Sequence, residues 1–180
     1  MSAKYNSIEF YLAEQSFSGG SPGHGIGIRI DGRDFKDIVR QWELPSAAAE
    51  GYPQMAGNYN YRSLYNSMTS IYYFLGRLTE GDECPVKKGM YLLVCNCGMA
   101  SCDSLSCRVH VKKKSITWHT FRRQVRPDWD YAWHEFRFRR KDYLMAIIEL
   151  GGLITQQLVK DCEAKKAGIL AEFLEYTRQS

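Results

Sequence analysis

The chain has 180 residues, of which 44% are hydrophobic and 13% aromatic, and its formal net charge is +4. A chain of this length can bury a core of its own, so we expect one domain over residues 1–180. No apolar run approaches the roughly 20 residues that span a bilayer, and the first residues lack the apolar segment of a secretory signal. We therefore exclude a membrane partner and expect a cytoplasmic protein, in which the six cysteines are free thiols or metal ligands rather than disulfides.

The first third of the chain alternates between strand and helix patterns. Residues 7–14 and 26–30 carry apolar side chains at every second position, which predicts two strands. Between them, the glycine-rich run over 18–23 predicts a loop. A short helix is expected to begin after Asp34, which is placed as its N-cap. This helix is expected to end at Leu44, because a residue that precedes proline disfavours the helical region.

The rest of the chain predicts a meander of strands between helices. A loop over 46–60 and an apolar helical stripe over 64–78 come first. Further elements are strands over 90–94, 105–111, 115–121 and 135–139, and helices over 142–150 and 153–177 with a break at Gly151-Gly152. The expected fold is α+β: a single domain, mainly an antiparallel β-meander with helices packed to one side and a long C-terminal helix.

Four cysteines gather around the connection between two of the predicted strands. Cys95, Cys97, Cys102 and Cys107 supply the number of thiolates that a tetrahedral zinc site needs. Cys95 and Cys97 could share one face, because residues two apart in a strand point the same way. The spacing nevertheless differs from the paired Cys-x2–4-Cys knuckles of most structural zinc sites. Zinc is the one candidate cofactor, and no other is expected.

Two other interpretations of these cysteines stay open. Small apolar thiols can simply fill a tight hairpin, since free cysteine is among the most buried side chains. Alternatively, a thiol-dependent enzyme would use Cys97 or Cys102 as its nucleophile, with His110 or His119 as the base. Because no carboxylate in the sequence is placed to orient either histidine, we assign no catalytic residue.

The positive charge is concentrated in one segment. From Arg108 to Lys141 the chain has eleven Lys and Arg against three acids, whereas the remainder has thirteen against seventeen. A local excess of this size attracts polyanions or an acidic protein surface, although a solvated sheet face can also carry it. The candidate basic patch comprises Lys112, Lys113, Lys114, Arg122, Arg123, Arg137 and Arg139.

Several blocks, taken in order, resemble a family of bacterial proteins of unknown function. They are residues 30–35, 95–102 (Cys-x-Cys-Gly-x-x-x-Cys), 108–109, 116–121, 126–131 (Arg-Pro-x-Trp-Asp-Tyr) and 136–143 (Phe-x-Phe before Tyr143). The resemblance covers residues 26–148 and implies a compact α+β domain without a known activity. It also implies cysteine at positions 95, 97 and 102, whereas the position of Cys107 is commonly a small residue in that family.

Size, compartment and architecture are also similar to those of immunity proteins of polymorphic toxin systems, such as contact-dependent growth inhibition. We therefore expect a non-enzymatic binding protein whose partner is a cognate toxin domain. Aromatic anchors dominate interface energetics, so the candidate partner-binding residues are Tyr59, Tyr61, Trp129, Asp130, Tyr131 and Trp133. One alternative is a zinc-stabilised module whose basic residues contact nucleic-acid phosphates; the other is the thiol-dependent enzyme.

Overall fold

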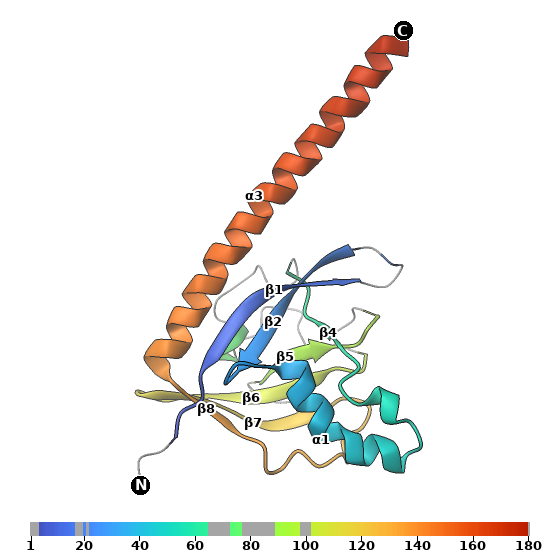
Figure 1. The fold of residues 1–180 in the computed structure, drawn as a ribbon. Helices are drawn as coiled ribbons and strands as arrows, with labels where there is room; N and C mark the ends of the chain where they lie inside the picture. Colours follow the sequence, from blue (N-terminus) through green and yellow to red (C-terminus); the bar gives the residue numbers. More distant parts are fainter. Residues whose placement is uncertain are drawn as a thin grey trace.

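The computed structural model describes residues 4–16, 20, 22–64, 73–76, 89–97 and 102–179, the last range with side chains as far as residue 168. The described strands form two antiparallel sheets (Figure 1). The first has the order β1-β2-β3, with bounds Ile8–Ser16, Pro22–Ile30 and Arg33–Asp34. The second has the order β4-β5-β6-β7-β8, with bounds Asn60–Tyr61, Gly89–Val94, Leu105–Val111, Ser115–Arg123 and Phe136–Arg139.

These sheets confirm the predicted α+β class and its antiparallel meander. Strands β5 to β8 follow one another in the chain and in space, as the alternating patterns predicted. The N-terminal hairpin instead forms its own sheet, which two backbone links join to the second one. Ile26 N donates to Arg62 O at 2.9 Å, and Asn6 bridges in parallel to Phe138.

Helix α1 spans Phe35–Ala49 and therefore runs past Pro45, contrary to the predicted end at Leu44. Its start is as expected, since the Asp34 side chain accepts a hydrogen bond from Lys36 N at 2.9 Å. Proline removes one helical hydrogen bond, but continuing the helix buries Ala47 against the core. Tertiary burial thus outweighs the local preference. The remainder of the predicted 46–60 loop contains a 3-10 turn, η1 (Pro53–Met55), before β4.

The helix predicted over 64–78 lies mostly outside the described residues. Within that range the structure describes Leu64 and a 3-10 turn, η2, over Tyr73–Leu75. Both Tyr73 and Phe74 are buried. The predicted loop over 18–23 is likewise only partly described, and its last residues already belong to β2.

A bulge in β7 changes which side chains face the core. The pairing between β6 and β7 shifts between Ser106 and Arg108, so that Thr120 and Phe121 together oppose Cys107. Thr120 has a φ of 54°, in the left-handed region. As a result both Trp118 and Phe121 point inward, although they are three residues apart.

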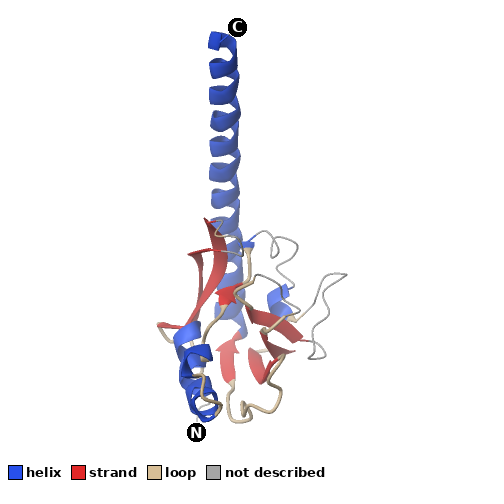
Figure 2. Cartoon of the chain, turned by 90° about the vertical axis from the view of Figure 1, so that its right-hand side faces the viewer, coloured by secondary structure: helices blue, strands red, loops and turns tan. Residues whose placement is uncertain are grey.

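Helix α3 spans Arg140–Gln179 as one continuous helix, so the break predicted at Gly151-Gly152 is absent. Glycine lowers helix propensity but keeps its backbone N–H, so it can stay within the hydrogen-bond ladder. The first turns bury Tyr143, Ala146, Ile147 and Leu150, and this part contacts β1, β7 and β8. Beyond them the helix projects away from the sheets (Figures 1 and 2).

One aromatic cluster fills the space between the sheets and α3. Trp118 lies edge-on to Phe35 and to Tyr143, with ring centroids 6.2 and 5.9 Å apart. Its indole N–H donates to the Tyr143 hydroxyl at 3.0 Å, and that hydroxyl donates to Phe74 O at 2.6 Å. The polar atoms of these buried rings are therefore satisfied.

Candidate functional site

Three of the predicted metal ligands meet in the connection that joins β5 to β6. Cys95 and Cys97 follow β5, Cys102 precedes β6, and their three Sγ atoms lie within 4.8 Å of one another. All three thiols are partly exposed, so an ion could reach them from solvent. Among the described residues no fourth His, Cys, Asp or Glu joins the group. The arrangement could therefore hold a metal ion with three thiolates.

Hydrogen bonds from neighbouring residues fix both halves of this thiol cluster to the body of the protein. Asn96, between two of the cysteines, donates to Asn58 Oδ1 at 2.5 Å and accepts from Asn60 Nδ2 at 3.3 Å. On the other side, Asp103 directly follows Cys102 and binds Arg123. The cysteines thus come from anchored backbone rather than from free loop ends, which favours a preorganised site.

The pKa values of two thiols in the cluster are shifted in opposite directions. Hydrogen bonds to Cys95 and Cys97, together with burial, raise the pKa of the Cys102 thiol to about 11. Burial raises the pKa of Cys95, but hydrogen bonds from Cys97, Cys102 and the Asp103 backbone outweigh it and bring that pKa below its ordinary value. A negative sulfur is therefore stabilised at Cys95, and a thiolate is the form that binds metals.

Cys107 does not belong to the cluster, which corrects the predicted four-thiol set. It lies within β6 opposite Met90 and is fully buried. This cysteine fits the alternative interpretation of a small apolar side chain that fills the core.

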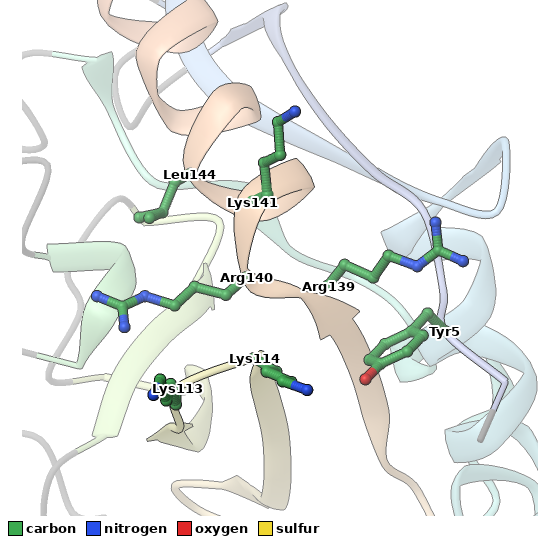
Figure 3. A pocket seen from close by; sticks show the side chains of 7 residues that line it. All are labelled: Tyr5, Lys113, Lys114, Arg139, Arg140, Lys141 and Leu144. Carbon is green, nitrogen blue, oxygen red and sulfur yellow. The ribbon is translucent and has the colours of Figure 1, made fainter. Parts of the chain in front are cut away.

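A basic pocket of about 670 Å3 lies where the β6–β7 turn meets the start of α3 (Figure 3). Its lining residues are Tyr5, Lys113, Lys114, Arg139, Arg140, Lys141 and Leu144. Lys113 and Lys114 lie below the helix start, Arg140 extends to one side, and Arg139 extends toward Tyr5 on the other. Arg140 N donates to Lys114 O at 3.1 Å, which ties the turn to the helix.

The electrostatics of this pocket are one-sided, because five cations and no carboxylate line it. Within the part of the chain that the structure describes, none of the five forms an ion pair. The guanidinium of Arg139 lies 5.5 Å from the Tyr5 ring centroid, and that of Arg137 lies 5.3 Å from it. An anion would therefore meet positive charge that nothing on the described protein surface neutralises.

The predicted basic patch is only partly realised in this pocket. Lys113, Lys114 and Arg139 line it, and Arg137 stands beside it on the Tyr5 ring, whereas Lys112 and Arg122 are exposed outside the lining. Arg140 and Lys141, which belong to the same basic segment, complete the cationic lining. Sequence reasoning missed Tyr5, which the pairing of Asn6 with Phe138 brings to this pocket.

Arg123 is not part of any basic surface, which corrects another prediction. Its side chain is 3% exposed and forms ion pairs with Asp103 and Glu43 at 2.7 and 3.2 Å. Glu43, itself fully buried, also accepts hydrogen bonds from the hydroxyls of Tyr59 and Tyr131 at 2.5 and 2.6 Å. Arg123 is therefore the central cation of a buried polar network.

Most of the predicted partner-binding residues belong to the core. Tyr59, Tyr61, Trp129 and Tyr131 are 4%, 1%, 8% and 5% exposed, so they do not form an exposed contact face. Each also has a hydrogen-bonded polar atom: Tyr61 donates to Asp34, for example, and Trp129 to Glu50. Of the predicted set, only Asp130 and Trp133 are exposed, and Trp133 is 88% exposed.

Comparison with family models, with curated proteins and with solved structures gave no match. The resemblance over residues 26–148 therefore stays a prediction. Among the described residues, no helix has the length and apolarity to cross a bilayer.

Proposed function

We propose that the protein is a non-enzymatic binding protein that contacts the phosphate backbone of a nucleic acid through its basic pocket. The observation that carries this proposal is the set of five cations around one concavity, for which the described residues supply neither an ion-pair partner nor a lining carboxylate. Such a surface attracts phosphates and releases their counterions, which is the main source of sequence-independent affinity for nucleic acids.

The composition of the pocket lining supports an extended strand rather than a single small anion. Its cations come from three segments, the β6–β7 turn, the end of β8 and the start of α3. Tyr5 and Leu144 add a ring and an apolar side chain to the same lining. Proteins that bind single strands without sequence preference combine a positive groove with aromatic platforms of this kind.

Zinc at the thiol cluster belongs to the same proposal. Thiolates are preferred zinc ligands, and Cys95, Cys97 and Cys102 would occupy three positions of its tetrahedron. The ion would fix the connection between β5 and β6. Its role here is structural, since the cluster and the basic pocket share no lining residue.

The test is fluorescence anisotropy with a labelled single-stranded oligonucleotide and a duplex of equal length, over a range of salt concentrations. The variant Lys113→Gln/Lys114→Gln/Arg139→Gln should bind more weakly, and its log K against log salt should fall less steeply by about 2. A matched control, Lys160→Gln/Lys165→Gln/Lys166→Gln, removes the same charge from the exposed part of α3. Salt-independent binding, or an equal loss in the control, would contradict the proposal.

A cytoplasmic immunity protein against a toxin domain is the second candidate. The observation that favours it is Trp133, which is almost fully exposed in the same loop as Asp130 and so provides an anchor for a protein partner. Co-expression with a toxin encoded by a neighbouring gene provides the test. Protection of the cells, lost on Trp133→Ala, is the expected result. Absence of both a complex and protection would remove this candidate.

A thiol-dependent enzyme is the third candidate. Its nucleophile would be Cys97 or Cys102, both in the thiol cluster. Alkylation of the cysteines separates it from the two binding functions, because it would abolish turnover but leave binding at the basic pocket unchanged.

A further inference from the structure

A second pocket, of opposite charge, lies at the other end of β8 from the basic pocket. Arg139 at the end of β8 lines the basic pocket, whereas Glu135, which directly precedes the strand, lines this one. Its volume is about 810 Å3, and it is formed by two segments, residues 119–121 of β7 and the loop over 128–135. We call it the acidic pocket.

Aromatic rings make up much of the lining of the acidic pocket. Phe121, Trp129 and Tyr131 line it, are at most 8% exposed, and connect it to the core. Trp133 lines it as well, but this residue is 88% exposed. A tryptophan in this setting has no packing role of its own and offers its face to an incoming group.

Three carboxylates stand around these rings: Asp128, Asp130 and Glu135. All three are exposed, and none forms an ion pair within the described chain. Asp130 uses Oδ1 to accept a hydrogen bond from Ala132 N at 2.8 Å, which leaves Oδ2 available to a ligand. The acidic pocket therefore complements a cation.

The two histidines of the lining add little opposing charge at neutral pH. Burial lowers the pKa of His134, whose ring is stacked on Trp42 with centroids 3.9 Å apart. Burial, reinforced by the nearby Arg108, also lowers the pKa of His119, with Glu135 acting in the opposite direction. Both imidazoles are thus mainly neutral at pH 7.

The loop that carries these groups is held in place before any ligand arrives. Trp129 donates its indole N–H to Glu50 at 2.6 Å, and Tyr131 donates to the buried Glu43. On the β7 side, the bulge at Thr120 determines how residues 119–121 line the acidic pocket. Little ordering entropy would be lost on binding.

From these contacts we infer that the acidic pocket receives an arginine side chain from a basic segment of a partner protein. A guanidinium can stack on the Trp133 indole while its N–H groups bind the Asp130 and Glu135 carboxylates, in a geometry that a lysine ammonium does not match. This inference goes beyond nucleic-acid binding and does not depend on it, because the two pockets share no residue.

The test measures the anisotropy of fluorescein-labelled nona-arginine and nona-lysine peptides with the full-length protein at about 0.15 M ionic strength, where the Debye length is about 8 Å. Nona-arginine should bind more tightly than nona-lysine. Trp133→Ala and Asp130→Asn/Glu135→Gln should each weaken nona-arginine binding about tenfold or more. Asn at position 130 keeps an oxygen for the Ala132 N–H, so the turn is preserved.

The matched control is Glu14→Gln/Glu163→Gln, which removes the same charge from exposed residues of β1 and α3. It should change the affinity by less than about twofold, because distant surface charges are screened. Thermal melts of each variant verify that it is folded. Equal binding of both peptides, wild-type affinity in Trp133→Ala, or an equal loss in the control would each overturn the inference.

Discussion

The Arg123 guanidinium binds the Asp103 carboxylate with two nitrogens, Nε to Oδ1 at 3.0 Å and Nη2 to Oδ2 at 2.7 Å. Asp103 directly follows Cys102, so this pair connects the thiol cluster to the buried network around Glu43. The Arg123 guanidinium thereby fixes the connection between β5 and β6 to β7 and to α1. Arg126 adds a second link, since it pairs with Asp103 at 3.5 Å and with Glu50 at 3.0 Å.

Replacing this guanidinium should strongly destabilise the fold. Arg123→Leu leaves Glu43 as an uncompensated buried charge, and we expect a loss of about 3–5 kcal/mol in the free energy of unfolding. Urea denaturation measures it. Arg122→Leu, the exposed neighbour on β7, should stay within about 0.5 kcal/mol of the wild type. Similar losses in the two variants would show that Arg123 carries no special electrostatic role.

Metal binding should require Cys95, Cys97 and Cys102. It should not require Cys107 or Cys162, the other two cysteines that the structure describes. Purified protein is expected to contain close to one zinc per chain, and Co²⁺ should give thiolate charge-transfer absorption. Cys97→Ser should abolish both signals, whereas Cys107→Ser and Cys162→Ser should retain them, since neither residue belongs to the cluster. Zinc at 100 times its Kd should stabilise the wild type by about 2.7 kcal/mol. A metal-free protein that also rejects Co²⁺ would count against the site.

The left-handed backbone at Thr120 predicts a stabilising substitution. A β-branched residue with positive φ is strained by about 1–2 kcal/mol, and glycine adopts this region freely. Thr120→Gly should therefore raise the free energy of unfolding by up to about 1 kcal/mol, even though it removes the contact of Thr120 Oγ1 with His119 Nδ1. Thr117→Gly, in the regular part of β7, should lower it instead. A loss at both positions would refute the strain at Thr120.

Patterns of period two in the sequence predicted the β5–β6 hairpin and the strands after it, because each strand buries one face against a common core. Sequence reasoning was wrong where a distant partner decides the outcome. Tyr59 and Tyr131 resemble interface anchors in the sequence, but both hydroxyls donate hydrogen bonds to Glu43, which is 16 and 88 residues away from them in the chain. Arg123 likewise looks like any other basic residue of its segment. The bulge at Thr120 has no local sequence signal at all, and it reverses the expected alternation along β7.

The carboxyl group of Asp34 predicts a specific acid sensitivity. Burial raises its pKa, but hydrogen bonds from the hydroxyls of Tyr11 and Tyr61 and from Lys36 N outweigh burial, so the pKa lies below the ordinary value of 3.8. A lowered folded-state pKa gives stability that is complete above the unfolded pKa and is lost as the pH falls through the folded value.

Stability measured between about pH 6 and 2 should therefore fall less steeply below about pH 4 in Asp34→Asn than in the wild type. Tyr61→Phe should also reduce the slope, because it removes one of the hydrogen bonds that favour the ionised carboxyl. Asp37→Asn, an exposed residue in the first turn of α1, serves as the control. Identical acid profiles for Asp34→Asn and the wild type would disprove the assignment.

The two glycines inside α3 provide a last prediction about stability. A Cβ added at Gly151 or Gly152 meets no atom within 4 Å, and the backbone there is helical. Because alanine is favoured over glycine in helix interiors by about 1 kcal/mol, Gly151→Ala/Gly152→Ala should raise the free energy of unfolding. Gly27 in β2 supplies the contrast, since a Cβ there would lie 2.3 Å from Tyr11 Cζ. Gly27→Ala should therefore destabilise the N-terminal sheet. A loss of stability in the double variant would mean that α3 needs these glycines to bend or open in solution.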